Sequence, residues 1–104
     1  MKEILKKVEK VVILTLFCSL HVLNAADAAG IYKKCSGCHG KDGKHKAFDR
    51  SAVIAGESKE TLLKKLMFFQ STDSDKGTLS VMKKQLKNLT KEEMESLAEY
   101  ISKL

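Results

Sequence analysis

The feature that most constrains this chain is a five-residue motif, Cys35-Ser36-Gly37-Cys38-His39. Its C-x-x-C-H spacing is typical of sites where haem is covalently attached to protein. Two thiols separated by two residues can each form a thioether with one of the two haem vinyl groups. The adjacent His39 then lies under the iron as its proximal ligand. A chain with such a site must fold around a large apolar plate.

Two other kinds of site also use a C-x-x-C spacing. A thioredoxin-like redox site belongs to an alternating strand-helix pattern, which this chain does not show. A zinc site could take Cys35, Cys38 and either His39 or His45 as ligands. The chain has no second C-x-x-C and no H-x-x-x-H pair to complete a usual set of four. Covalent haem is therefore the favoured interpretation, and a haem-free metal or thiol protein is the alternative.

The first 25 residues predict a secretory signal peptide. Four lysines within the first ten residues precede an apolar run over residues 11–23, and small residues follow that run. The run is too short to span a bilayer comfortably. We expect cleavage near Ala25, which would leave one domain over residues 26–104 in the periplasm. Cys18 would be removed with the peptide, so the mature chain would keep only the two motif cysteines.

Size and charge limit what the mature chain can do alone. The full sequence has 104 residues, a formal net charge of +6 and no proline. Without residues 1–25, fifteen basic and eleven acidic side chains remain, which gives a net charge of +4. Nucleic-acid binding is not expected despite this charge, because the chain is predicted to be exported. A domain of this size has a marginal apolar core, so we expect the haem-free chain to fold poorly.

Helical periodicity predicts an all-α domain with three to five short helices. The first is expected over residues 26–34, ahead of the motif, and Gly37, Gly40 and Gly43 are expected to break it into a loop. No alternating strand pattern is present. The residues between 52 and 56 form a short apolar segment that is predicted to pack on the haem edge.

Two more helices are predicted in the second half of the chain. Ser58 is expected to cap the first of them, and residues 78–86, which include Leu79, Val81 and Met82, are expected to follow the polar loop between the two helices. Thr90 and Glu93 match a capping box at the start of a last helix over residues 91–102. The apolar stripe of the helix after Ser58 is predicted to consist of Leu62, Leu63, Leu66, Met67 and Phe69.

The second axial ligand decides whether the iron carries electrons, binds a gas or does chemistry. Met82 follows a polar, glycine-containing loop between helices and lies far enough from His39 to reach the opposite haem face. Met67 and Met94 fall within apolar helical stripes, where methionine usually fills gaps in the core. His45 lies only six residues after His39 and is not expected to reach the other face. Met82 is therefore the favoured distal ligand, with Met67 and Met94 as the main alternatives.

Taken together, these segments resemble a small bacterial class I cytochrome c of the cytochrome c553 type. The resemblance covers nearly all of residues 26–104. It rests on the motif with the residues that follow it, on a second short segment, and on a methionine shortly before the last helix. These are Gly40-Lys41-Asp42-Gly43, Ile54-Ala55-Gly56, and Met82 ahead of the segment from Leu89 to Ile101.

The resemblance implies the cytochrome c fold, wrapped around one covalently bound haem c. It implies thioethers at Cys35 and Cys38, a proximal His39 and a distal Met82, and it places Tyr100 against the N-terminal helix. Many relatives also have a proline after the motif, whose carbonyl accepts a hydrogen bond from the proximal histidine. Because this chain has no proline, another carbonyl around residues 51–53 is expected to orient the imidazole.

A haem iron with histidine and methionine ligands is coordinatively saturated, so it can cycle between Fe(II) and Fe(III) without binding a substrate. The sequence shows no catalytic base, nucleophile or substrate pocket. We therefore predict a soluble electron carrier and not an enzyme. The alternative is a haem-based sensor or gas-binding domain whose sixth position is open or labile.

A carrier must meet its redox partners quickly, and a basic rim around the haem edge would steer a monomer to acidic docking sites. Candidate partners include a membrane-bound reductase or a terminal oxidase. The same lysines could instead be ordinary solvated surface. The lysines that lie near the motif or Met82 in sequence are Lys33, Lys34, Lys41, Lys44, Lys46, Lys83, Lys84 and Lys87.

Overall fold

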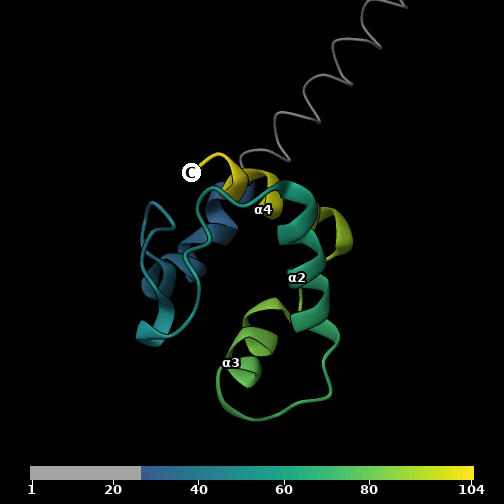
Figure 1. Ribbon diagram of the computed structural model, residues 1–104. Helices are drawn as coiled ribbons and strands as arrows, with labels where there is room; N and C mark the ends of the chain where they lie inside the picture. Colours follow the sequence, from purple (N-terminus) through teal and green to yellow (C-terminus); the bar gives the residue numbers. More distant parts are fainter. Residues whose placement is uncertain (1–26) are drawn as a thin grey trace, which may run out of the picture.

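A computed structural model describes residues 27–104, and this part of the chain is all-α, as predicted (Figure 1). The N-terminal helix covers residues 27–39. It is followed by the 3-10 turn η1 (Ala47–Asp49) and by the helices α2 (Lys59–Ser71), α3 (Gly77–Leu86) and α4 (Lys91–Ser102). Within residues 27–104, none of the helices has the length and hydrophobicity that a membrane span requires. The predicted signal peptide lies outside the described residues.

The N-terminal helix is longer than the sequence predicted. It continues through His39 and so contains the whole motif, whereas we expected Gly37 to help end it. Gly37 is exposed and a Cβ there would meet no atom within 4 Å, and a single glycine weakens a helix by only about 1 kcal/mol. The helix ends at Gly40, whose φ of +83° suits glycine and whose N–H donates to the carbonyl oxygen of Ser36 at 2.9 Å.

Side-chain caps fix the starts of α2 and α4, as predicted. The Ser58 hydroxyl accepts a hydrogen bond from the Thr61 N–H at 3.2 Å. At α4 the Thr90 hydroxyl accepts from the Glu93 N–H, and the Glu93 carboxylate accepts from the Thr90 N–H, both at 3.1 Å. These bonds satisfy backbone donors that a helix start leaves unpaired. The predicted bounds of the last helix, residues 91–102, are confirmed.

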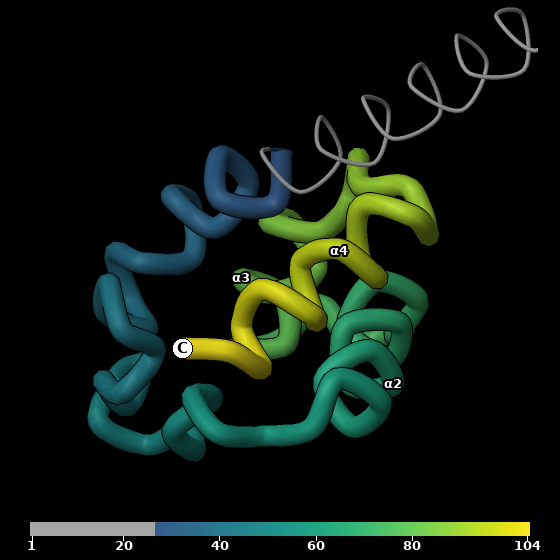
Figure 2. Tube along the Cα trace, turned by 90° about the horizontal axis from the view of Figure 1, so that it is seen from above, coloured from purple at the N-terminus to yellow at the C-terminus, as the bar shows by residue number. Residues whose placement is uncertain are grey.

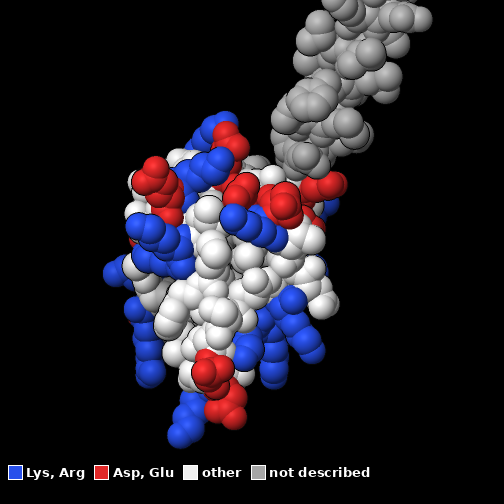
Figure 3. Space-filling view, turned by 90° about the vertical axis from the view of Figure 1, so that its right-hand side faces the viewer, with Lys and Arg blue, Asp and Glu red and all other residues white. Residues whose placement is uncertain are grey.

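One apolar core joins the four helices. Met94 is buried in it, as its place in the α4 stripe predicted. Met67 is different: it is 43 % exposed, because Leu66 points inward and the next residue is turned about 100° away from it. Seen from the α2 side, the surface is uncharged in the middle and framed by charged groups (Figure 3). The buried core residues are Tyr32, Leu62, Leu66, Leu86, Met94, Leu97, Ala98 and Ile101.

Two tyrosines join the ends of the domain. The rings of Tyr32, in the N-terminal helix, and Tyr100, in α4, have centroids 5.3 Å apart at a tilt of 46°. This contact confirms the predicted packing of Tyr100, and Figure 2 shows α4 between the N-terminal helix and α2. The Tyr32 hydroxyl also donates to the carbonyl oxygen of Gly40 at 2.6 Å. The loop that leaves the motif is thereby tied back to the helix that carries it.

We expect Tyr32→Phe to lower the free energy of unfolding by about 1 kcal/mol, because it removes one partly buried hydrogen bond and leaves the Gly40 carbonyl without that donor. Chemical denaturation of the haem-loaded protein, followed by far-UV circular dichroism, measures the change. Tyr100→Phe is the matched control, since no described residue accepts a hydrogen bond from its hydroxyl. Equal denaturation midpoints for Tyr32→Phe and Tyr100→Phe would contradict a stabilising role for the hydrogen bond between Tyr32 and Gly40.

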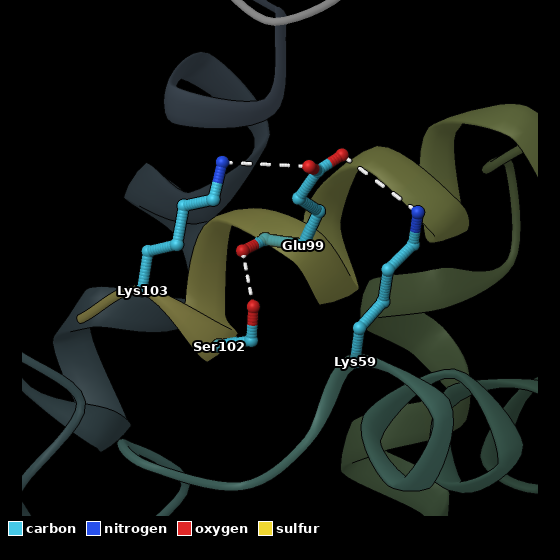
Figure 4. Close-up of polar contacts among 4 residues, drawn as sticks. All are labelled: Lys59, Glu99, Ser102 and Lys103. Atoms are coloured by element: carbon cyan, nitrogen blue, oxygen red, sulfur yellow. Dashed lines mark hydrogen bonds and ion pairs between the residues drawn. The ribbon is translucent and has the colours of Figure 1, made fainter.

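A small polar cluster joins the start of α2 to the end of α4 (Figure 4). The Glu99 carboxylate lies 3.7 Å from the Lys59 ammonium and 3.4 Å from that of Lys103. The Ser102 hydroxyl donates to the Glu99 carbonyl oxygen at 2.6 Å. The hydrogen bond and the positive charge of Lys103, followed by the charge of Lys59, lower the pKa of Glu99. Because these groups are exposed, the cluster contributes little to stability.

Candidate haem site

A cavity of about 210 Å³ lies at the centre of the domain, and its wall is mostly apolar. Side chains from the N-terminal helix, the η1 turn, α2, α3 and α4 contribute to the wall. The four predicted site residues Cys35, Cys38, His39 and Met82 all line it. The fold therefore brings the motif and a methionine more than forty positions away to one space.

The two motif thiols are free and lie within the last five residues of the N-terminal helix. Cys38 is exposed, whereas Cys35 is half-buried. Burial raises the pKa of the Cys35 thiol, the neighbouring Cys38 raises it further, and Lys34 opposes both effects. An apolar wall disfavours a thiolate but accommodates a neutral thioether without cost. The surroundings of Cys35 thus suit a covalently attached, uncharged product.

His39 is 9 % exposed and lines the same wall. Burial lowers the pKa of its imidazole, and His45 lowers it further, so the ring is held in the neutral form that binds metals. Its Nδ1 atom is buried and has no hydrogen-bond partner among the described residues. The carbonyl that we predicted from residues 51–53 is therefore not in place. That loop does reach the cavity, but it brings the buried and likewise unpartnered hydroxyl of Ser51.

A tight turn returns the chain to the cavity after the motif. Gly43 has a φ of +70°, and a Cβ there would lie 3.2 Å from Leu104 Cδ1, so only glycine fits without strain. Its carbonyl oxygen accepts from the N–H groups of Ile54, at 3.2 Å, and Ala55, at 3.0 Å. Ile54 consequently lines the cavity, which agrees with the predicted packing of residues 52–56. His45 is exposed and is not part of the wall.

Met82 is the one methionine within residues 27–104 that lines the cavity. Met67 is exposed on α2, and Met94 is buried in the core. We expected Met82 in a bend between helices, but it lies inside α3. The sequence misled here because Gly77 begins the helix and does not prolong the loop. Its left-handed φ of +58° lets the chain turn directly into α3.

Two further residues of the cavity wall, Phe48 and Glu57, were not predicted from the sequence. Phe48 lines the cavity although it is 55 % exposed, and it and Asp49 both have left-handed φ values near +57°. Such backbone is strained for non-glycine residues. Glu57 also lines the cavity and pairs with the Lys65 ammonium at 2.6 Å. Its second carboxylate oxygen is buried without a described partner.

This donor set fits a covalently attached haem: two thiols and a neutral imidazole adjoin an apolar cavity that a thioether sulfur also reaches. Comparison with protein families supports the same interpretation of the site: the model of the family described as Cytochrome c matches residues 25–104. The chain belongs to the cytochrome c family. Proteins of this family carry electrons, are not enzymes and bind haem c covalently, which confirms the predicted cofactor and class of function.

The relatives found are small cytochromes of one type. The chain is 38 % identical over 80 residues to a cytochrome c-553 from Nitratidesulfovibrio vulgaris, a match that covers 77 % of this chain and 78 % of the relative. A cytochrome c-553 from Helicobacter pylori is 34 % identical over 100 residues, covering 96 % and 99 %. Together with the helical fold, these matches confirm the predicted resemblance to the cytochrome c553 type and identify this member of the cytochrome c family as a monohaem electron carrier.

Proposed function

We propose that this cytochrome c is a periplasmic carrier whose iron is bound by His39 and Met82 and cycles between Fe(II) and Fe(III). The observation that carries the proposal is that His39 and Met82 line one cavity from different segments, while Met67 and Met94 do not line it. Cys35 and Cys38 are the proposed thioether sites. Export follows from the predicted signal peptide over residues 1–25, which lies ahead of the matched domain.

Each of these residues has a separate task. When bound, haem c supplies a one-electron Fe(II)/Fe(III) couple. The motif cysteines would hold the cofactor beside the N-terminal helix, and His39 would supply a neutral imidazole as a ligand. Met82 presents a thioether sulfur from α3, which favours Fe(II) and raises the reduction potential.

The test is spectroscopy of the exported, purified protein in its ferric and dithionite-reduced forms. We expect sharp ferrous α and β bands, retention of haem through acid-acetone extraction, and the weak far-red ferric band of iron–methionine bonding. Covalent haem without the far-red band, together with carbon monoxide binding to the ferrous protein, would support the alternative of a sensor or gas-binding domain. Absence of haem from protein matured with the attachment machinery would support a metal or thiol protein.

A basic docking surface is the proposed route to acidic redox partners such as a membrane-bound reductase or a terminal oxidase. Lys33 and Lys34 on the N-terminal helix and Lys84 on α3 are exposed, on two of the elements that line the cavity. Lys83 is half-buried, and its ammonium donates to the Thr72 carbonyl oxygen at 2.6 Å, so its positive charge is held in a fixed position on α3.

We expect the rate of electron transfer with an acidic partner to fall at least several-fold when ionic strength rises from about 0.01 M to 0.15 M, since the Debye length shrinks from roughly 30 Å to 8 Å. Stopped-flow mixing with an acidic redox protein measures the rate. Lys34→Gln should weaken the salt dependence, whereas Lys91→Gln, at the start of α4 and outside the predicted rim, should not. A salt-independent rate would show that these lysines are only solvated surface.

A further inference from the structure

Gln70, near the end of α2, connects this helix to the far end of α3. Its side-chain nitrogen donates two hydrogen bonds, one to the carbonyl oxygen of Leu86 at 2.9 Å and one to that of Leu89 at 2.8 Å. A primary amide has two N–H donors on one nitrogen, so both are used. Since both acceptors are carbonyls, only the amide nitrogen can face them, which fixes the orientation of the group.

The position of these acceptors matters because Met82 lies one helical turn before Leu86. Residues four positions apart lie on the same face of a helix, and both side chains line the cavity. Helix ends leave their last carbonyls without partners inside the helix. Gln70 adds a second donor to the carbonyl of Leu86, the last residue of α3, which also accepts from the Leu89 N–H at 3.1 Å, and it holds the Leu89 carbonyl in the loop that follows. Gln70 therefore ties the C-terminal end of α3, on which the Met82 side chain depends for its position, to α2.

The rest of α3 makes few buried apolar contacts with the other helices. Leu86 is the one fully buried side chain in this helix, and α3 begins after an exposed polar loop. A second polar contact ties it to the end of α2, where the Lys83 ammonium donates to the Thr72 carbonyl oxygen. With so little apolar burial of its own, α3 depends on such contacts to keep a defined position relative to α2.

We propose that Gln70 is a positioning residue for iron–methionine bonding: its amide holds the C-terminal end of α3 against α2 and so keeps the Met82 sulfur directed into the cavity. The inference rests on the proposed role of Met82 as the distal ligand. Gln70 does not line the cavity itself and acts only through α3. The relevant quantity is therefore the equilibrium between a closed state, with Met82 in place, and an open state in which α3 has moved away.

Imidazole competes with Met82 for the sixth position of the ferric protein, and its apparent affinity reports the population of the open state. One hydrogen bond of this kind contributes a factor of roughly 2 to 12 to an equilibrium. For Gln70→Met, which keeps the side-chain length but removes both donors, we expect imidazole to bind about ten-fold more tightly. We also expect the limiting rate of binding at high imidazole, which is the rate of Met82 release, to rise.

Ser71→Ala is the matched control. Ser71 is the next residue on α2, and its hydroxyl donates to the Met67 carbonyl oxygen within the same helix at 2.9 Å, so its loss should leave imidazole binding within two-fold of wild type. If Gln70→Met accumulates without haem, Gln70→Glu replaces it, because the carboxylate preserves size but offers no donor at neutral pH. A lowered melting temperature with unchanged imidazole affinity and release rate would overturn the inference and leave Gln70 a purely structural residue.

The ferric spectrum of the wild-type protein distinguishes a failure of this inference from a failure of the proposed function. A missing far-red band in the wild type would show that Met82 is not bound, and the proposed ligation would then fail before any Gln70 variant is measured. A normal wild-type band together with wild-type imidazole binding in Gln70→Met would refute the positioning role alone.

Discussion

Met82→Ala is expected to abolish the far-red ferric band and to let the ferrous protein bind carbon monoxide. Alanine has no sulfur, and no other methionine within residues 27–104 lines the cavity. Loss of the thioether removes a ligand that favours Fe(II), so the reduction potential should fall by on the order of 0.1 V or more, within the ~0.8 V range that axial ligands span. Visible and near-infrared spectra and a potentiometric titration measure both effects.

Met67→Ala is the control for this experiment. Met67 is exposed on α2 and is absent from the cavity wall, so its variant should keep the far-red band and the wild-type potential. Met94→Ala is a poorer control because that side chain is buried in the core. If the far-red band survived in Met82→Ala and disappeared in Met67→Ala, the proposed assignment of the distal ligand would be wrong.

Local signals in the sequence predicted most of the fold. Thr90 with Glu93, and Ser58 before the second apolar stripe, marked helix starts correctly because a cap is a contact between near neighbours. The end of the first helix was predicted less well. Gly37 and Gly40 look alike in the sequence, yet only Gly40 takes a left-handed φ. Which glycine ends a helix depends on where the following chain must go, and that is set by the packing of the whole domain.

The residues of the candidate site could be proposed from the sequence where a motif or a residue type indicates their chemistry. The motif named three of its residues, and the place of Met82 after a polar loop, together with the resemblance to a family, favoured the fourth; all four line the cavity. The contacts that surround them were not predictable. The amide of Gln70 reaches carbonyls 16 and 19 positions away, and the pairing of Glu57 with Lys65 at the wall has no spacing rule. Such contacts depend on tertiary distances that a pattern of residue types does not encode.

Removing the haem is expected to cost this domain most of its stability, because the cavity is part of the core. Leu66, Leu86 and Leu97 belong to the buried cluster and also line the cavity. Without the cofactor these side chains would lose apolar contacts and face water in a partly open cavity, and each Å² of apolar surface left in water costs about 25 cal/mol. A domain the size of residues 26–104 has a total free energy of unfolding of only about 4 to 12 kcal/mol.

The double variant Cys35→Ala/Cys38→Ala tests this expectation, because it leaves no thiol in the described chain for attachment. Purified without haem, it should show much weaker far-UV helical signal than the wild type and no cooperative thermal transition. Cys18→Ala is the matched control: it removes a cysteine that we predict to leave with the signal peptide and that lies outside the described residues, so it should mature with haem and melt like the wild type. A haem-free double variant that melted cooperatively within a few degrees of the wild type would show that the apolar contacts of α2, α3 and α4 hold the fold without the cofactor. The marginal core predicted from the size of the domain would then be wrong.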